Sequence, residues 1–181
     1  PEFLSFVGII PVPVRHGLTL GEMARYMNAQ HGLGADLTMI EMPGWRRGLW
    51  FDQTGLPWPP TSPAMPHFET TILYPGTCLL EGTNLSVGRG TALPFEICGA
   101  PWVDGHALAD ALNRLELSGV RFRPTQFTPA ADRFAGQVCN GIQVHVTDRR
   151  RLCPVTLGLH LVAVLRSLYP EHFAWAAAHF D

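Results

Sequence analysis

The sequence predicts an α+β fold, because helical and strand-like segments alternate irregularly and lack the regular strand–helix–strand spacing of a parallel α/β protein. A length of 181 residues suffices for a compact domain with a hydrophobic core. Apolar residues make up 46% and charged residues 15%, which is typical of a folded globular protein. Eighteen glycines and sixteen prolines predict short elements joined by shaped loops.

The N-terminal third is expected to hold two short strands and one helix. Apolar residues predict the strands at 3–7 and 37–42. Thr19 followed by Glu22 forms a capping-box pattern that begins the helix, and Gly32 ends it. Residues 43–66 hold six prolines and three tryptophans without periodicity, which predicts a long loop with a functional role.

The remaining residues carry clearer periodic signals. Residues 68–80 mix helical and strand patterns and are interrupted by Pro75-Gly76, and residues 82–94 predict a loop. Strands are expected at 95–98, 120–127 and 141–147. Helices are expected at 107–115 after Asp104, at 154–168 and at 171–179.

Composition excludes several functional classes. The net charge of −2, with Arg149-Arg150-Arg151 as the one basic run, predicts no nucleic-acid partner. No apolar stretch is long enough for a transmembrane segment. All thirteen basic residues are arginine, which excludes a lysine nucleophile. The four cysteines and the histidines lack metal-ligand spacing, so no metal site is predicted.

Two N-terminal stretches are candidates for ligand binding. Arg15 and His16 precede a capped helix, a position that favours anions, although a loop histidine is more often structural. Glu22 suits a capping role as well as a catalytic one. Trp45, in the same loop as Asp52, presents an aromatic face that matches a pyranose ring, or else it staples the loop to the core.

A third stretch, residues 81–91, is dense in hydroxyl, amide and glycine groups. It carries one carboxylate and one guanidinium, at Glu81 and Arg89, with Asn84 and Ser86 between them. Such a segment suits binding of a polar ligand, although a turn-rich connector has a similar composition.

These stretches together resemble one family, the exo-acting β-N-acetylmuramidases, long catalogued as a bacterial family of unknown function. The matching segments cover nearly the whole chain in the family's order. They are residues 6–8, 13–22, 36–38, 42–47, 51–58, 74–86, 88–91, 94–96, 119–124 and 141–148. Val87 stands where the family often has glutamate, and Ala64 where asparagine is common.

The resemblance implies a two-part enzyme with the active site in the cleft between its parts. Residues 1–181 are expected to form its C-terminal α+β domain, with 1–17 as a linker from a Rossmann-like N-terminal part that is mostly absent. A leader sequence could precede the chain in the parent protein. The implied reaction is hydrolytic release of terminal N-acetylmuramic acid from the non-reducing end of peptidoglycan fragments, in cell-wall recycling. No cofactor is implied, the expected location is periplasmic or extracellular, and the fragment alone is expected to be inactive.

The resemblance also suggests roles for the candidate residues. Glu81, Glu22 and His16 are the catalytic candidates, with at least one further acid expected upstream of Pro1. Arg15 or Arg89 is expected to grip the lactyl carboxylate that distinguishes muramic acid from glucosamine. The remaining substrate-binding candidates are Trp45, Asp52, Asn84 and Ser86.

Two other functions remain open at this point. One is a non-catalytic domain that binds peptidoglycan saccharides through the same tryptophans and Arg89. The other is an amidase or esterase with Cys78 as nucleophile, although a structural thiol is the commoner role for such a residue.

Overall fold

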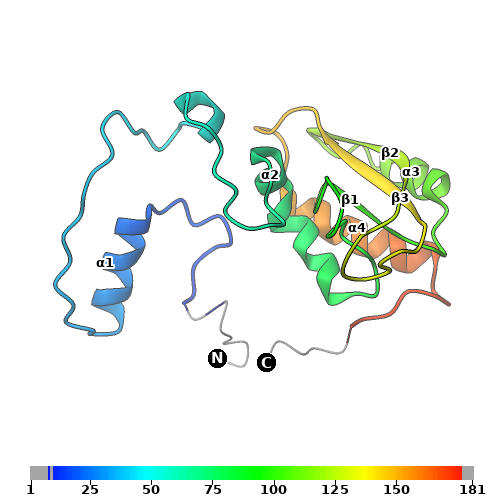
Figure 1. Cartoon of the computed structure of the whole chain (residues 1–181), viewed down its shortest axis with the longest axis horizontal. Helices are drawn as coiled ribbons and strands as arrows, with labels where there is room; N and C mark the ends of the chain where they lie inside the picture. The colour runs from blue at the N-terminus through cyan, green and yellow to red at the C-terminus, as the bar shows by residue number, and fades with distance from the viewer. Residues whose placement is uncertain (1–7, 9, 177–181) are drawn as a thin grey trace. The chain divides into compact units, whose positions relative to one another are not determined.

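The computed structural model describes Gly8 and residues 10–176 and confirms the α+β class (Figure 1). The chain divides into two compact units, Pro1–Gly55 and Leu56–Asp181. The predicted strand at residues 3–7 lies outside the described residues. None of the described helices has the length and apolarity that a membrane crossing requires.

The first unit contains one α-helix, α1 (Leu20–Gln30), which begins as the sequence predicts. The Thr19 hydroxyl accepts a hydrogen bond from the Glu22 amide at 3.1 Å. The Glu22 carboxylate accepts one from the Thr19 amide at 2.8 Å. Gly32, at φ 58°, follows the last turn and allows the chain to reverse.

The rest of this unit is irregular. The strand predicted at residues 37–42 is wrong, and only a 3₁₀ turn, η1 (Phe51–Thr54), interrupts the loop that follows. A strand needs a neighbour for its backbone hydrogen bonds, and the described part of this unit provides none. No described residue of the unit is buried, and Leu20 and Ile40 are 91% and 94% exposed.

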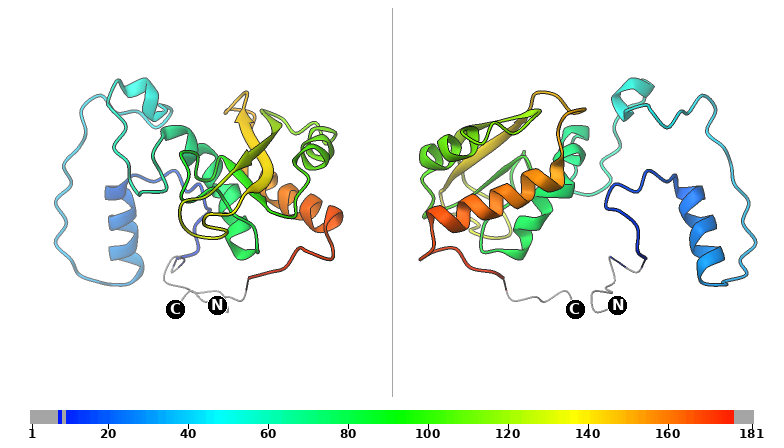
Figure 2. Two further views of the ribbon diagram at one scale, coloured as in Figure 1. Left: turned by 45° about the vertical axis from the view of Figure 1, so that its right-hand side comes forward. Right: turned by 180° about the vertical axis from the view of Figure 1, so that it is seen from behind.

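The second unit contains an antiparallel three-stranded sheet (Figure 2). Its strands are β1 (Ile97–Ala100), β2 (Val120–Phe127) and β3 (Cys139–Val146), in the order β1-β3-β2. Phe122 lies opposite Val144 in the β2–β3 pair. Alternation buries Val120 and Phe122 while Arg121 and Arg123 face solvent, which confirms the predicted strand at 120–127.

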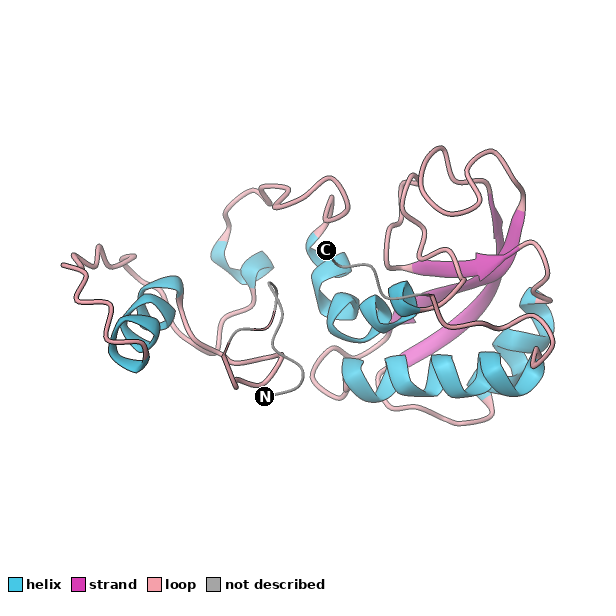
Figure 3. Cartoon of the chain, turned by 90° about the horizontal axis from the view of Figure 1, so that it is seen from below, coloured by secondary structure: helices cyan, strands magenta, loops and turns pink. Residues whose placement is uncertain are grey.

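Four helical segments pack around this sheet (Figure 3). They are α2 (Phe68–Thr77), the 3₁₀ turn η2 (Cys78–Gly82), α3 (Gly105–Asn113) and α4 (Pro154–Leu168). The α3 helix packs on β2 and β3, and α4 contacts α2, η2 and α3. Asp104 caps α3 by accepting from the His106 and Ala107 amides at 2.9 and 3.1 Å.

The crossing of α2 and α4 depends on two glycines. A Cβ atom on Gly76 would lie 1.7 Å from the Pro154 carbonyl oxygen, and one on Gly158 would lie 2.2 Å from the Gly76 carbonyl oxygen. The expected interruption at Pro75-Gly76 is wrong, because α2 continues through Pro75 to Thr77. The close approach to α4 holds this proline-containing turn in place.

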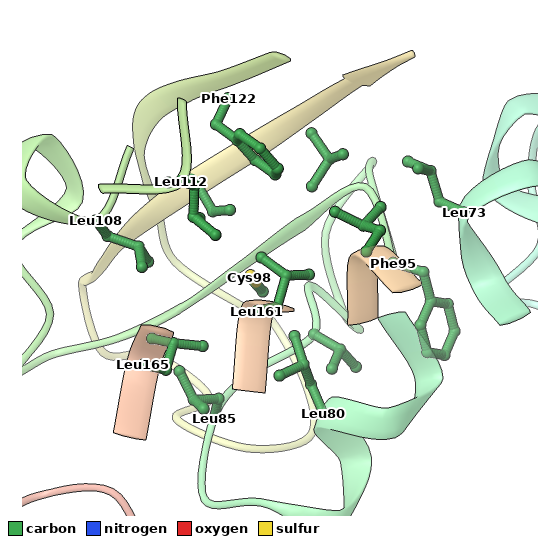
Figure 4. Packing of buried hydrophobic residues seen from close by; sticks show 14 of the residues in the cluster. Leu73, Leu80, Leu85, Phe95, Cys98, Leu108, Leu112, Phe122, Leu161 and Leu165 are labelled. Atoms are coloured by element: carbon green, nitrogen blue, oxygen red, sulfur yellow. The ribbon is translucent and has the colours of Figure 1, made fainter. Parts of the chain in front are cut away.

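One hydrophobic core lies between the sheet and the helices (Figure 4). Leu73 and Leu80 enter it from α2 and η2, Phe122 from β2, and Leu161 and Leu165 from α4. This core holds the loops around residues 81–96 in place.

The helix predicted at 171–179 is wrong for residues 171–176, and 177–179 lie outside the described residues. Trp175 instead forms a β-bridge with Thr83. The Asn84 amide donates to the Ala174 carbonyl at 3.0 Å and the Ala176 amide donates to the Gly82 carbonyl at 2.9 Å. Tertiary pairing therefore overrides the helix propensity of this alanine-rich segment.

Candidate functional site

The structure brings Glu81 and Arg89 together as an ion pair. Arg89 Nε donates to Glu81 Oε1 at 2.9 Å, and Arg89 Nη2 lies 2.7 Å from the same oxygen. The two side chains are 26% and 37% exposed, so the pair lies at the surface of the second unit. Asp132 Oδ2 lies 3.9 Å from Arg89 Nε. Two carboxylates thus flank one guanidinium, and Glu81 Oε2 has no hydrogen-bond partner among the described residues.

Phe95 forms the base of this cluster. It is fully buried and adopts φ 62°, an unusual backbone conformation for a bulky residue. The Arg89 guanidinium lies 4.9 Å from the centre of its ring, and Tyr74 contacts the ring edge-on at 4.8 Å between centroids. Strained, well-packed residues of this kind cluster at functional sites. The motifs around 81, 89 and 95 therefore converge on one place.

Cys78 lies near the same cluster, and the raised pKa of its thiol disfavours a role as a nucleophile. Burial raises the pKa of the Cys78 thiol, and the charge of Glu81 raises it further. Burial, followed by the effects of Cys78 and Glu81, likewise raises the pKa of Tyr74. Because the thiolate is the reactive form, a raised pKa lowers the fraction of Cys78 able to attack a substrate. None of the four cysteines, all of which lie in the described part of the chain, forms a disulfide.

Asn84 and Ser86 have their polar groups engaged within the fold. Asn84 Nδ2 donates to the His172 carbonyl at 2.8 Å, and its Oδ1 accepts from the Ala174 amide at 3.0 Å. Ser86 is 3% exposed, and its hydroxyl accepts from the Gly88 amide at 3.2 Å. These contacts give both residues structural functions, and their substrate-binding role stays a prediction.

In the first unit, Glu22 is engaged at both carboxylate oxygens. Oε2 accepts from the Thr19 amide, while Oε1 forms an ion pair with Arg47, which also donates to the Gly17 carbonyl. The Arg47 hydrogen bond, with that from Thr19, lowers the pKa of Glu22 to about 2. Glu22 is therefore ionised at neutral pH and holds no proton to donate.

The other candidates of this unit lie on exposed loops. The Arg15 guanidinium lies 5.9 Å from the centre of the Trp50 ring, and the Arg47 guanidinium lies 5.2 Å from the centre of the Trp45 ring. His16 Nδ1 accepts from the Leu18 amide at 2.9 Å. Asp52 lies in η1 and is exposed. The structure thus groups the predicted residues by unit, with Glu22 and Trp45 linked through Arg47 and Glu81 joined to Arg89.

The structure also assembles a group that sequence reasoning missed. Glu96 Oε1 lies 3.1 Å from His67 Nδ1 and accepts from the Thr70 hydroxyl at 2.7 Å. Glu96 lies in one of the segments that resemble the family, whereas His67 lies 29 residues away and outside all of them. Only the fold places the two together.

Two further features bear on ligand binding. Among the described residues, no group of three or more histidine, cysteine, aspartate or glutamate side chains could hold a metal ion. A pocket of about 620 Å³ lies between the start of α3, the second half of β2 and the start of β3. Part of its polar lining is engaged within the fold, since Gln126 donates to Asn140 at 2.9 Å and Asp104 caps α3.

Comparison with known proteins identifies both parts of the chain. Residues 72–181 match the family model described as exo-beta-N-acetylmuramidase NamZ, C-terminal. Residues 1–69 match the model described as the N-terminal part of the same enzyme. The junction between the two models falls at the start of α2, within the second unit, whose first residue is Leu56.

Individual relatives agree with these models. The chain is 46% identical to a Bacillus subtilis (strain 168) protein named peptidoglycan beta-N-acetylmuramidase NamZ, over the whole chain and 44% of that protein. A Bacteroides fragilis DUF1343 family crystal structure matches 94% of the chain and 45% of its own, at 35% identity and TM-score 0.87. A second Bacteroides fragilis DUF1343 family crystal structure matches 78% of this chain and 37% of its own length, at 30% identity and TM-score 0.58.

The chain thus spans less than half the length of the relatives it matches. Within that span, both family models apply in sequence order, and together they cover nearly every residue. The chain therefore belongs to the exo-beta-N-acetylmuramidase NamZ family.

Proposed function

We propose that the parent of this chain is a glycoside hydrolase that releases terminal N-acetylmuramic acid from the non-reducing end of peptidoglycan fragments. The observation that carries this proposal is the 46% identity, along the whole chain, to a protein named peptidoglycan beta-N-acetylmuramidase. The parent then acts in cell-wall recycling outside the cytoplasm, in the periplasm or the extracellular medium. Detection of the parent in those fractions checks its location.

Residues 1–69 then form the end of the N-terminal part, and residues 72–181 the C-terminal part. The exposure of the first unit supports this division. Its apolar side chains, among them Leu20 and Ile40, find no core among the described residues. In the parent, the rest of the N-terminal part covers this apolar surface, because so much exposed hydrocarbon is unfavourable in water.

The carboxylates divide into different roles. Glu22, with its pKa of about 2, cannot serve as the proton donor at neutral pH and acts only as an anion that holds Arg47. Glu81 keeps Oε2 open, so it remains a candidate for orienting substrate or water. The proton donor that glycoside hydrolysis requires is then expected upstream of Pro1.

Arg15 is better suited than Arg89 to select the lactyl carboxylate. Arg89 is already bound to Glu81 and lies near Asp132, so a third carboxylate gains little there. Arg15 has no carboxylate partner among the described residues and rests on Trp50. Arg15→Ala should lower kcat/KM on a muramide about 10- to 150-fold, since a hydrogen bond to a charged group contributes about 1.5–3 kcal/mol. A glucosaminide analogue should lose little, and Arg89→Ala should affect both substrates alike.

The experiment that tests the function uses the full-length parent and a chromogenic β-N-acetylmuramide. Wild type should release the chromophore and N-acetylmuramic acid. Glu81→Gln, a change of one atom, should remain folded and lose most of its turnover if Glu81 works in the site. Absence of wild-type turnover on the muramide and on muramyl-glucosamine disaccharide would contradict the hydrolase.

Two other functions predict different outcomes. A saccharide-binding module would bind the disaccharide without cleaving it, which calorimetry with the full-length parent would show. A thiol-dependent amidase or esterase would lose activity on alkylation. The raised pKa of Cys78 disfavours this last alternative.

A further inference from the structure

His67 and Glu96 form a pair whose geometry differs from an ordinary surface contact. The Glu96 side chain is only 12% exposed, while the His67 side chain is 43% exposed. A carboxylate so nearly buried is costly unless it is hydrogen-bonded. The Thr70 hydroxyl, itself on a residue that is fully buried, supplies one bond to Oε1, and the imidazole supplies the other.

The backbone around Glu96 is held firmly. Its amide donates to the Leu93 carbonyl at 3.1 Å, and its carbonyl accepts from the Val144 amide at 2.8 Å. The preceding residue, Phe95, has φ 62°, and its ring contacts both Tyr74 and Arg89. Backbone strain that the surroundings maintain is a feature of functional sites, and here it fixes where the Glu96 carboxylate points.

The consequence for His67 is a fixed ring. A carboxylate at Nδ1 requires a proton on that nitrogen, so neutral His67 carries its lone pair on Nε2. No described residue bonds Nε2, and the ring is partly open to solvent. A rigid acceptor that the fold leaves unused is suited to a hydroxyl donor from outside the protein.

The surroundings suit a sugar. Phe68, the next residue, packs on Trp58 at 5.7 Å between ring centroids, and the Arg149 guanidinium lies 6.0 Å from the Phe68 ring. Aromatic faces match the C–H faces of pyranoses, and the hydroxyls of a pyranose need polar partners beside them. Both kinds of group occur together at the start of α2.

We propose that His67 is a saccharide-contacting residue whose Nε2 accepts a hydrogen bond from a sugar hydroxyl, and that Glu96 is the positioning residue that fixes its ring. The ligand class is an amino-sugar saccharide, so the inference rests on the proposed function. It adds a contact that no motif of the sequence indicated.

Two substitutions of His67 distinguish the contribution of Nε2 from that of Nδ1. Asparagine places an amide near the Nδ1 position, so His67→Asn keeps the bond to Glu96 and lacks the Nε2 contact. In the full-length parent, kcat/KM on muramyl-glucosamine disaccharide should fall about 2- to 12-fold, as for one neutral hydrogen bond, with Tm unchanged. His67→Gln, whose amide reaches the Nε2 position, should restore part of this loss. His106→Asn, at an exposed histidine whose side chain has no partner among the described residues, is the matched control.

Nitrogen-15 NMR of the full-length parent gives a readout that needs no turnover. The wild-type His67 signals should show the tautomer with its proton on Nδ1, and N-acetylmuramic acid should shift the Nε2 resonance. Wild-type kinetics in His67→Asn, or an Nε2 signal unmoved while other resonances shift, would overturn the proposal. If the Nε2 resonance shifts but the wild-type protein shows no turnover, the hydrolase proposal is rejected and the saccharide contact of His67 is kept. If the saccharide shifts no resonance at all, both the hydrolase and the His67 contact are rejected.

Discussion

Replacement of Gly76 by alanine tests whether α2 and α4 cross as closely as the structure shows. The new Cβ would lie 1.7 Å from the Pro154 carbonyl oxygen and 2.5 Å from its carbonyl carbon. Both are backbone atoms of the first turn of α4, so no side-chain rotation relieves the contact. The two helices must separate, and the core leucines between them lose packing.

The magnitude follows from two opposing effects. Overpacking of a core costs about 1–3 kcal/mol, and a clash with backbone lies at the upper end of that range. Alanine regains about 1 kcal/mol of helix propensity over glycine. The net loss of about 2 kcal/mol corresponds to a Tm about 8 °C lower in a domain of this size.

Thermal unfolding followed by circular dichroism measures the effect. Gly82→Ala is the matched control, because a Cβ on Gly82 meets no heavy atom within 4 Å. Gly158→Ala should act like Gly76→Ala, since its Cβ would lie 2.2 Å from the Gly76 carbonyl oxygen. A Gly76→Ala protein with the Tm of the control would refute the close crossing.

Three further predictions concern individual contacts. Arg47→Ala should raise the pKa of Glu22 from about 2 toward its ordinary value, which an NMR titration of the carboxyl group measures. With Arg47 present, the Glu22 cap of α1 should persist as the pH falls below 4.5 and be lost only near pH 2, because the pKa of Glu22 is lower in the folded than in the unfolded protein. Asn84→Ala removes two hydrogen bonds to residues 172–174 and should lower the free energy of unfolding by about 1–3 kcal/mol, measured by urea denaturation. Iodoacetamide should modify exposed Cys153 before buried Cys98, because burial raises the pKa of the Cys98 thiol to about 12. Mass spectrometry of the digested protein measures the order, and earlier modification of Cys98 would contradict the prediction.

Local sequence signals predicted the elements whose stability is local. The capping box at Thr19 and Glu22 has the expected hydrogen bonds, and the strand at 120–127 and helix at 154–168 have the bounds the patterns indicated. In each case the periodicity, the cap and the packing favour the same structure.

The errors occur where distant parts of the chain decide the structure. Residues 171–176 pair with Thr83 and Asn84 instead of forming a helix, and residues 37–42 find no strand partner among the described residues. The helix runs through Pro75 because the Gly76 contact with α4 supports it.

The candidate site shows the same division. The segment from Glu81 to Arg89 could be singled out because its composition is unusual, and the structure joins its two charges. The pairing of His67 with Glu96 spans 29 residues and has no local signal, so only the fold reveals it.

The central claim is that the parent removes muramic acid from the non-reducing end. The most direct measurement incubates the full-length parent with two disaccharides that differ only in order and follows the products by mass spectrometry. N-acetylmuramic acid should be released from muramyl-glucosamine, while glucosaminyl-muramic acid should remain intact. Cleavage of the second disaccharide alone, or of neither, would contradict the assignment.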